Sequence, residues 1–285
     1  MKALVTGASG QVGRALVSQC PAGWRCQTPG RGELDLADPA AIRAFVAREK
    51  PDIVFNAAAY TAVDRAESEP ELAHAINAAA PGAFADALAA TGGRLVQLST
   101  DFVFDGAQGR PYRPDDPRRP LSVYGQTKAA GEDAAGPGAI VVRTSWVHAA
   151  GGANFVRKMI ALMNEREELR VVADQIGAPT WATGLAAALW TLGQHGRAGI
   201  WHYRDCGVAS WYDFAEAIGH EALALGLVTR VPRIVPVATD AFPTPARRPG
   251  FSLLDIDATS AFLGEAPAHW RANLKTMLQE ERALG

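Results

Sequence analysis

A tyrosine and a lysine at helical spacing, Tyr124 and Lys128, form a pair that can transfer a proton. Residues four apart lie on one face of a helix, so the phenol and the ammonium can point into one cleft. Reduction of a carbonyl by hydride needs a proton donor, and a phenol with a pKa of about 10 is a weak donor near neutral pH. We expect the Lys128 ammonium to lower the pKa of Tyr124 and to contact the ribose of a nicotinamide cofactor.

Two hydroxyls and a carboxyl group stand at the end of an expected strand over 94–99. They belong to Ser99, Thr100 and Asp101. Ligands of open α/β sheets bind at the carboxyl ends of the strands, so we expect Thr100 to hydrogen-bond a substrate carbonyl beside Tyr124. Taken alone, Ser-Thr-Asp is also common in turns and helix caps.

A GxxGxxG pattern of Gly7, Gly10 and Gly13 lies between an expected strand over 2–6 and an expected helix over 11–20. Glycine permits a tight turn and lets the backbone approach a pyrophosphate, while the helix N-terminus offers free amides and a partial positive charge. Because the pattern follows the first strand, it favours a dinucleotide site over a purely structural turn.

The end of the second strand bears on the choice of cofactor, because NAD-selective sites usually carry Asp or Glu there. Residues 27–31 contain no acid but end in Arg31. A guanidinium can pair with the 2′-phosphate of NADPH, although Arg31 is also explained as a solvated loop residue. We therefore expect NADPH, with NADH as the alternative. The other expected cofactor contacts on this side are Asp35, Leu36, Ala57 and Ala58.

Short apolar runs alternate with helical stretches through the first half of the chain. Strands are expected over 2–6, 24–28, 52–56, 94–99 and 139–143, and helices over 11–20, 39–50, 72–90 and 123–133. Asp38 and Pro39 are typical of an N-cap and a first helical position. Pro81 is expected to interrupt the third helix. The alternation predicts a Rossmann-type doubly wound parallel sheet with right-handed crossovers.

The second half is less regular and contains six of the seven tryptophans. Helices are expected over 154–165, 180–192, 211–225 and 268–281, and strands over 169–172 and 200–203. Five prolines between 232 and 249 predict an ordered loop. We expect an NAD(P)-binding domain over 1–150 and a smaller α/β substrate lobe over 151–285, with some segments returning to the first domain.

Composition excludes several classes of protein. The 285 residues are 48% hydrophobic and 20% charged, which is enough for a large core and excludes disorder. A net charge of −2 without a basic tail argues against nucleic-acid or membrane partners. Three scattered cysteines form neither a disulfide framework nor a zinc motif. With no long apolar segment and no secretory signal, we expect a soluble, reduced, cytoplasmic protein.

Seven motifs together resemble the extended short-chain dehydrogenase/reductases, and among them the family of dTDP-4-dehydrorhamnose reductases. They are Thr6–Gly13, Asn56–Asp64, Ser99–Phe104, Tyr124–Lys128, Arg143–Trp146, Asp174–Thr180 and Pro243–Pro249. These motifs extend from one end of the chain to the other. The resemblance implies NAD(P)H-dependent reduction of the 4-keto group of dTDP-4-dehydro-L-rhamnose to dTDP-L-rhamnose, the last step of dTDP-rhamnose biosynthesis.

The resemblance also implies roles for single residues. Thr100, Tyr124 and Lys128 would be catalytic, while Asp101 and Trp146 would contact the sugar. The implied cofactor contacts, besides the glycines, are Gln11, Val12, Asp35, Leu36, Ala59, Tyr60 and Thr61, and we add Leu98 to them. Tyr60 stands where some relatives carry His. Asn154 and Arg247 are expected at the pyrophosphate of the sugar nucleotide.

One departure from the resemblance concerns metal. Some members share Mg²⁺ across a dimer through a Glu in the first helix and an acidic pair after the Gly-Ala-Pro-Thr segment. Here the first position is Ala15, and residues 181–186 contain no carboxylate. Because Mg²⁺ takes oxygen ligands that usually include carboxylates, we expect no bound metal. The expected assembly is a monomer or a weak homodimer that is not bridged by metal.

Two alternative functions remain compatible with the motifs. One is a reductase for another 4-keto-6-deoxy sugar nucleotide. The other is a non-catalytic, dinucleotide-binding regulatory subunit resembling that of methionine adenosyltransferase. The intact set of Thr100, Tyr124 and Lys128 favours an enzyme.

Overall fold

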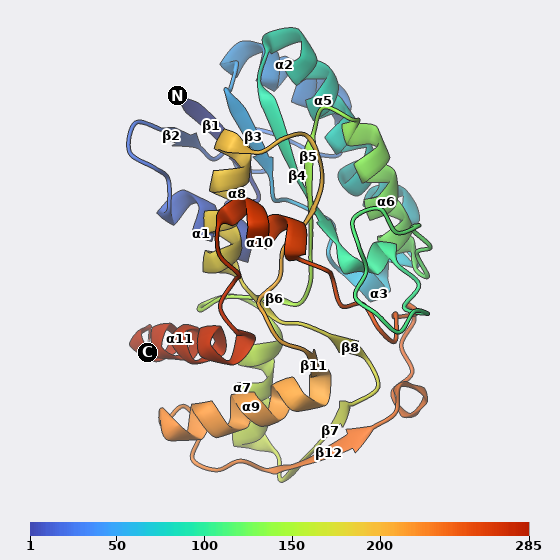
Figure 1. Cartoon of the computed structure of the whole chain (residues 1–285), viewed down its shortest axis with the longest axis vertical. Coiled ribbons are helices and arrows are strands. Elements are labelled where there is room, and N and C mark those ends of the chain that lie inside the picture. Colours follow the sequence, from blue (N-terminus) through green and yellow to red (C-terminus); the bar gives the residue numbers. More distant parts are fainter. Residues whose placement is uncertain (285) are drawn as a thin grey trace.

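The computed structural model describes residues 1–284 and shows a parallel sheet, covered by helices, joined to a smaller lobe (Figure 1). The spatial order of the sheet is β10 (Gly199–His202), β5 (Ile140–Thr144), β4 (Arg94–Thr100), β3 (Ile53–Asn56), β1 (Lys2–Thr6) and β2 (Arg25–Gln27). Every pairing in it is parallel. From β1 the chain adds β2 on one side of the sheet and then β3 on the other, so the strand order reverses between β1 and β3. Doubly wound sheets bind ligands at this switch point, beyond the carboxyl ends of the strands. The doubly wound α/β fold expected from the sequence is confirmed.

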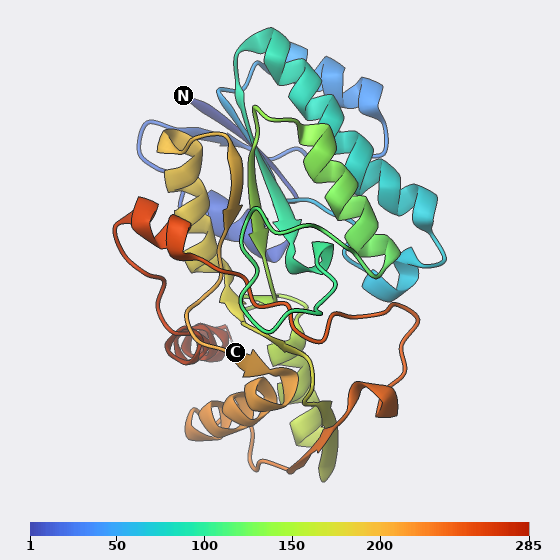
Figure 2. The same cartoon turned by 45° about the vertical axis from the view of Figure 1, so that its right-hand side comes forward.

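Alternate residues of the first strand bury themselves in two different layers of helices. Ala3 and Val5 pack with α1 (Gln11–Ser18) and α8 (Ala182–His195), whereas Leu4 packs with the opposite layer. That layer consists of α2 (Pro39–Glu49), α5 (Ala80–Thr91) and α6 (Val123–Ala135), which lie side by side in Figure 2. Strands covered on both faces need apolar side chains throughout, which explains the short apolar runs of the sequence.

The long helix of the first half is not interrupted at Pro81, contrary to the sequence-based expectation. After the short α3 (Val63–Ala66), α4 (Pro70–His74) continues through a π-helical turn, Ala75–Ala79, into α5. Pro81 falls in the first turn of α5, directly after this change of hydrogen-bond register, where its missing N–H costs little. The π turn also turns Asn77 inward, so that its amide donates to Thr127 of α6 at 3.1 Å.

The smaller lobe has a hydrophobic core of its own, in which Phe214 and Met163 are fully buried. Its helices are α7 (Phe155–Glu165), α9 (Trp211–Ala224) and α11 (Trp270–Ala283). Short strand pairs border them: β7 (Glu168–Val172) with β12 (Arg233–Val237), β8 (Ile176–Gly177) with β11 (Ala209–Ser210), and β6 (Val147–His148) with β9 (Thr180–Trp181). The short α10 (Asp257–Leu263) packs back against β10.

Strand β12 lies within 232–249, where the sequence predicts only a loop. It pairs in parallel with β7, and Pro236 stands opposite Val171. In a two-stranded ladder each strand is an edge, and an edge strand can contain proline because one row of its N–H groups needs no partner. The prolines therefore make this strand difficult to predict from the sequence, but they do not prevent it from forming.

The chain passes between the two parts more than once. After α7 and β7 have contributed to the lobe, α8 and β10 return to the large sheet. The chain then goes back to the lobe for α9 and β12. A single boundary near residue 150 therefore does not divide the molecule into two continuous pieces. Within residues 1–284 no helix has the length and apolarity needed to cross a membrane.

Candidate active site

The glycine turn after β1 is built for close backbone approach. Gly7 has a φ of 67°, and its carbonyl accepts the N–H of Gly10 at 2.8 Å. A Cβ on Gly7 would lie 2.9 Å from the backbone of Ala58, and a Cβ on Gly13 would collide with the Gly7 carbonyl. Helix α1 starts at Gln11 without a side-chain cap. Its first amides are therefore available to an anion such as a pyrophosphate.

Gln11 and Val12, at the start of α1, connect the turn to its surroundings. The Gln11 side chain accepts from the Asn154 amide at 2.7 Å and donates to the Val147 carbonyl at 3.3 Å, and both partners belong to the segment that leads into the smaller lobe. Val12 packs against the core between α1 and α8. These contacts therefore fix the position of the glycine turn relative to the segment that leads into the smaller lobe.

The segment after β2 leaves one guanidinium open to solvent. Arg31 is exposed in a turn, and it makes no hydrogen bond within the described chain. The Asp35 carboxylate accepts the N–H of Ala37 at 2.9 Å, and Leu36 is half-buried against the core of the α2 side. Arg31 can therefore turn toward a phosphate without losing an interaction.

The loop after β3 lies directly against the glycine turn. The Thr6 hydroxyl accepts the N–H of Ala58 at 3.2 Å, and Ala57–Tyr60 are half-buried while Thr61 is exposed. The Tyr60 N–H donates to Asn77, and its phenol donates to Glu69 at 2.6 Å. The backbone of this loop packs closely against Gly7, and its alanines present small side chains next to the glycine turn.

Tyr124 and Lys128 are one turn apart on α6, whose N-cap Ser122 accepts the N–H of Gly125 at 3.2 Å. The Lys128 ammonium is buried and donates to the carbonyl of Leu98, on β4, at 2.6 Å. Burial lowers the pKa of Lys128 to about 8, opposed by the negative charge of Glu132. Lys128 remains mainly protonated at neutral pH.

The pKa of Tyr124 moves in the direction opposite to the sequence-based expectation. Burial raises it to about 12; hydrogen bonding with Thr100 lowers it, and the charge of Asp101 raises it. The expected lowering by Lys128 is wrong for the free protein: desolvation of the phenol is the largest cause of the shift, and Lys128 is not among the groups that change the pKa of Tyr124. Tyr124 thus keeps its proton at neutral pH and is in the form that can donate it.

Thr100 is the last residue of β4, and Asp101 follows it at the same sheet edge. The Thr100 hydroxyl lies 3.0 Å from an Asp101 carboxyl oxygen, and the other oxygen accepts from Ser252 at 2.5 Å. Asp101 is buried, which raises its pKa to about 6. Both of its oxygens are therefore engaged within the protein, so Asp101 orients Thr100 and anchors the 252 segment.

Trp146 lies just beyond β5 with a left-handed backbone, at a φ of 47°. Its ring stacks on Trp211, with 3.7 Å between centroids and 12° between planes, and Gly177 lies against it. A pocket opens beside these rings; its lining consists of Phe102, Trp146, Gln175, Ile176, Trp211, Arg248, Pro249 and Ser252. The sequence pointed to Trp146 but missed Trp211, which directly follows a capping-box serine at the start of α9.

Neither of the two residues expected at the pyrophosphate of the sugar nucleotide, Asn154 and Arg247, lines the pocket beside Trp146. The Asn154 amide donates to Gln11 and Ala149, and its carbonyl caps α7, so its polar atoms are already used. Arg247 is exposed and does not line the pocket, whereas Arg248 does and pairs with Asp64 at 3.0 Å. The arginine that lines the pocket is therefore Arg248 and not Arg247. The direction of the two side chains determines this, and the sequence alone does not show it.

The residues just described converge on one edge of the sheet. The glycine turn, the alanine loop and Thr100 follow the carboxyl ends of β1, β3 and β4, and the tryptophan-lined pocket lies beyond β5. A nucleotide-binding turn beside a Tyr–Lys pair with a hydroxyl partner defines a Rossmann-type oxidoreductase of the short-chain dehydrogenase/reductase class.

Comparison with known proteins specifies the family. The model described as "RmlD substrate binding domain" matches residues 1–283. A dTDP-4-dehydrorhamnose reductase of Burkholderia thailandensis is 43% identical, covering 95% of this chain and 96% of the relative, and one of Streptomyces griseus is 44% identical, covering 95% and 91%. The structure of the Bacillus anthracis dTDP-4-dehydrorhamnose reductase, in complex with NADP, is 33% identical with a TM-score of 0.91 over 98% of this chain and 99% of that one. The chain belongs to the dTDP-4-dehydrorhamnose reductase family.

Proposed function

We propose that this chain reduces the 4-keto group of dTDP-4-dehydro-L-rhamnose with NADPH and so forms dTDP-L-rhamnose. The observation that carries the proposal is the position of the protonated Tyr124 phenol. It forms a hydrogen bond with Thr100, the last residue of β4, and its ring contacts Phe102, which lines the pocket walled by Trp146 and Trp211. That arrangement places a proton donor next to an aromatic pocket, on the sheet edge that also carries the glycine turn.

The residues present fit a nicotinamide dinucleotide. Gly7 and Gly13 leave no space for a Cβ, and the uncapped start of α1 faces the turn. The glycine turn would hold the pyrophosphate, Arg31 the 2′-phosphate, and Lys128 the nicotinamide ribose. When bound, the cofactor supplies the hydride that the keto carbon accepts.

The proton that the carbonyl oxygen needs comes from residues of this chain. As the carbonyl bond opens, its electron pair moves to the oxygen, which takes the Tyr124 proton and becomes the 4-hydroxyl. When substrate binds, the Thr100 hydroxyl proton would turn from Asp101 to that oxygen and orient it. The positive charge of Lys128 stabilises the tyrosinate that remains until solvent returns a proton. Arg248 is placed to meet the diphosphate of the sugar nucleotide at the pocket.

The proposal is tested by NADPH oxidation with a panel of 4-keto-6-deoxy sugar nucleotides that differ in nucleotide and in sugar stereochemistry. The highest kcat/KM is expected for dTDP-4-dehydro-L-rhamnose. A higher value for another member would reassign the substrate. Tight NADPH binding without oxidation of any member would instead favour a regulatory subunit.

Arg31→Ala is expected to weaken NADPH binding selectively. The guanidinium is exposed and unpaired within residues 1–284, so its removal leaves the fold intact but deletes a charge-assisted contact to the 2′-phosphate. We expect the Kd for NADPH to rise about 5- to 100-fold and that for NADH to stay nearly constant. Fluorescence titration measures both, with Arg230→Ala in the smaller lobe as control. Equal losses for the two cofactors would place Arg31 away from the 2′-phosphate.

Activity is expected to survive chelation by EDTA, and any dimer should not depend on Mg²⁺. Ala15 is buried in α1, and the described residues contain no cluster of three or more His, Cys, Asp or Glu side chains able to hold a metal. Methyl groups cannot replace carboxylate ligands. Sedimentation velocity with Mg²⁺ and with EDTA should give the same species. A dimer that dissociates on chelation would show a bridging metal after all.

A further inference from the structure

A buried carboxylate stands at the far end of the face that carries Tyr124 and Lys128. Glu132 of α6 accepts two hydrogen bonds from the Arg143 guanidinium, at 2.8 and 2.7 Å, and one from the Ser99 hydroxyl at 2.5 Å. Arg118 adds a fourth at 3.1 Å. The side chains of Glu132 and Arg143 are each only 2% exposed. The carboxylate is therefore held by the strands β4 and β5 and by the loop that carries Arg118.

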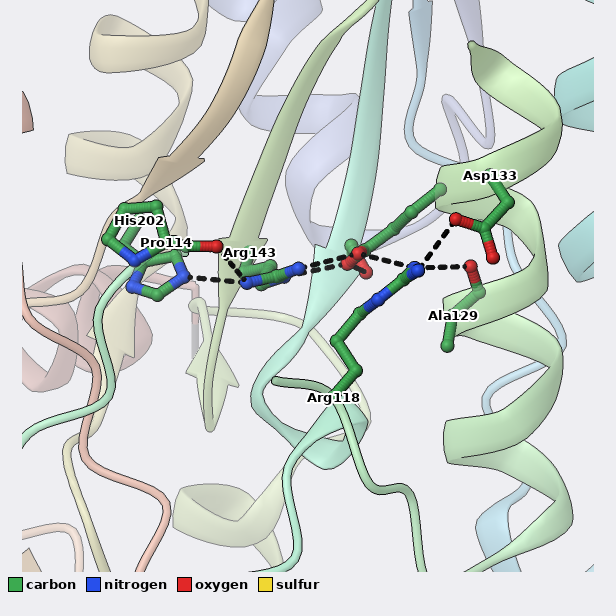
Figure 3. Close-up of polar contacts among 8 residues, drawn as sticks. Pro114, Arg118, Ala129, Asp133, Arg143 and His202 are labelled. Atoms are coloured by element: carbon green, nitrogen blue, oxygen red, sulfur yellow. Dashed lines mark hydrogen bonds and ion pairs between the residues drawn. The ribbon is translucent and has the colours of Figure 1, made fainter. Parts of the chain in front are cut away.

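The partners of Glu132 are themselves fixed. Arg143, on β5, also donates to the Pro114 carbonyl at 3.1 Å and contacts His202 of β10 at 3.2 Å (Figure 3). Burial, together with the neighbouring Arg143 charge, lowers the pKa of His202 to about 3, so this imidazole is neutral. Arg118 donates to the Ala129 carbonyl and to Asp133 on the outer face of α6 (Figure 3). Two guanidinium groups thus converge on one carboxylate.

Glu132 is also aligned with the reacting pair. Tyr124, Lys128 and Glu132 are successive members of an i, i+4 series, so they follow one face of α6. Lys128 has no ion pair within 4 Å in the described chain, and its hydrogen bond goes to the neutral Leu98 carbonyl. Glu132 raises the pKa of Lys128 against the effect of burial, and no other charged group contributes to that shift. The charged groups around Glu132 are Arg118 and Arg143.

We propose that Glu132 is a positioning residue, which fastens α6 to β4 and β5 and supplies the negative charge that keeps Lys128 in its ammonium form. Without it, the two guanidinium groups would lose the carboxylate that they share, and no negative charge would oppose the effect of burial on the Lys128 ammonium. The catalytic consequence rests on the proposed function, since Lys128 must be positive to stabilise the tyrosinate. The electrostatic claim itself does not depend on turnover.

The test follows the protonation of Lys128 directly. The protein contains five lysines, and Lys128 is the one that is buried, so ¹³Cε-lysine NMR gives few resonances, assigned by the missing signal of Lys128→Arg. The Lys128 signal should titrate near pH 8 in the wild type. In Glu132→Gln the midpoint should fall by about 0.5–1 pH unit, less than for an unscreened charge pair because the arginines neutralise part of the charge.

The matched control removes a neighbouring carboxylate. Asp133→Asn deletes the same charge and also loses a bond from Arg118, at 2.6 Å, but its side chain is 69% exposed and outside the Lys128 face. Its midpoint should equal that of the wild type. A folded Glu132→Gln protein whose Lys128 midpoint also stays at the wild-type value would overturn the proposal.

A second variant keeps the test decisive if Glu132→Gln does not fold. Glu132→Gln combined with Arg118→Gln removes the carboxylate together with one of the two guanidinium charges that it binds, and Arg118 is partly exposed. The Lys128 midpoint should again fall by about 0.5–1 pH unit, because Glu132 is the charged group that raises the Lys128 pKa. A purely structural role for the cluster would leave that midpoint at the wild-type value. Because NMR needs no substrate, an enzyme that fails to reduce keto sugars would contradict the proposed function and leave this result intact.

Discussion

Replacing Tyr124 with phenylalanine is expected to lower kcat about 10²- to 10⁴-fold while NADPH binding stays nearly unchanged. The ring remains and keeps its edge contact with Phe102, so the substitution removes the phenol proton and little else. Thr100 can still orient the carbonyl, but its aliphatic hydroxyl is a far weaker acid than a phenol and it lies beside the Asp101 carboxyl group, so it cannot replace the lost proton donor. NADPH oxidation under saturating substrate gives kcat, and fluorescence titration gives the cofactor Kd.

Tyr112→Phe provides the control for this substitution. Its phenol also donates to a carboxylate, that of Asp105 at 2.7 Å, but the residue does not line the tryptophan-walled pocket. The Tyr112 variant should therefore lose some stability and retain kcat. A Tyr124→Phe enzyme with near-wild-type kcat would assign proton donation to another group.

Gly13→Ala is expected to raise the Kd for NADPH at least 10- to 100-fold, which corresponds to about 1.4–2.8 kcal/mol. A methyl group at this position would collide with the Gly7 carbonyl and lie 2.7 Å from Ala8 Cα. Both neighbours are backbone, so the turn itself must open, and overpacking of this kind typically costs about 1–3 kcal/mol. The opened turn presents its amides in the wrong place for a pyrophosphate.

The control for Gly13→Ala is Gly138→Ala. Gly138 lies in an exposed turn before β5, and a Cβ there meets nothing within 4 Å. Thermal unfolding with and without NADPH separates loss of stability from loss of binding. Gly138→Ala should keep the full thermal shift on adding NADPH, and Gly13→Ala should lose most of it. An unchanged NADPH affinity in folded Gly13→Ala would place the pyrophosphate elsewhere.

Local chemistry allowed much of the fold to be predicted from the sequence. Strand β1 was predicted with its observed bounds because buried parallel strands need an unbroken apolar run. Asp38 and Pro39 marked the start of α2 because capping is a short-range interaction: the Asp38 side chain accepts from the amides of Ala40 and Ala41. Strand β12 was missed because pairing with β7, more than 60 residues away in sequence, outweighs its local proline signal.

The residues of the candidate site were predictable where the position of the backbone alone determines that they lie at the site. Gly7 and Thr100 follow strand ends, so the parallel sheet brings them to one edge whatever their side chains do. The pKa of Tyr124 was not predictable, because its shift comes from desolvation by neighbours distant in sequence. Nor could the sequence indicate that Arg248 lines the pocket while Arg247 does not, or that Glu132 binds Arg143, because side-chain directions and long-range contacts decide both.

The most direct test of the central claim follows the transferred hydrogen. The enzyme would be given dTDP-4-dehydro-L-rhamnose and NADPH carrying deuterium at both nicotinamide C4 positions, and the product would be examined by NMR and mass spectrometry. We predict dTDP-L-rhamnose with a single deuterium, bound to C4 of the sugar. A sugar product without deuterium at C4, or NADPH left unoxidised, would contradict this prediction.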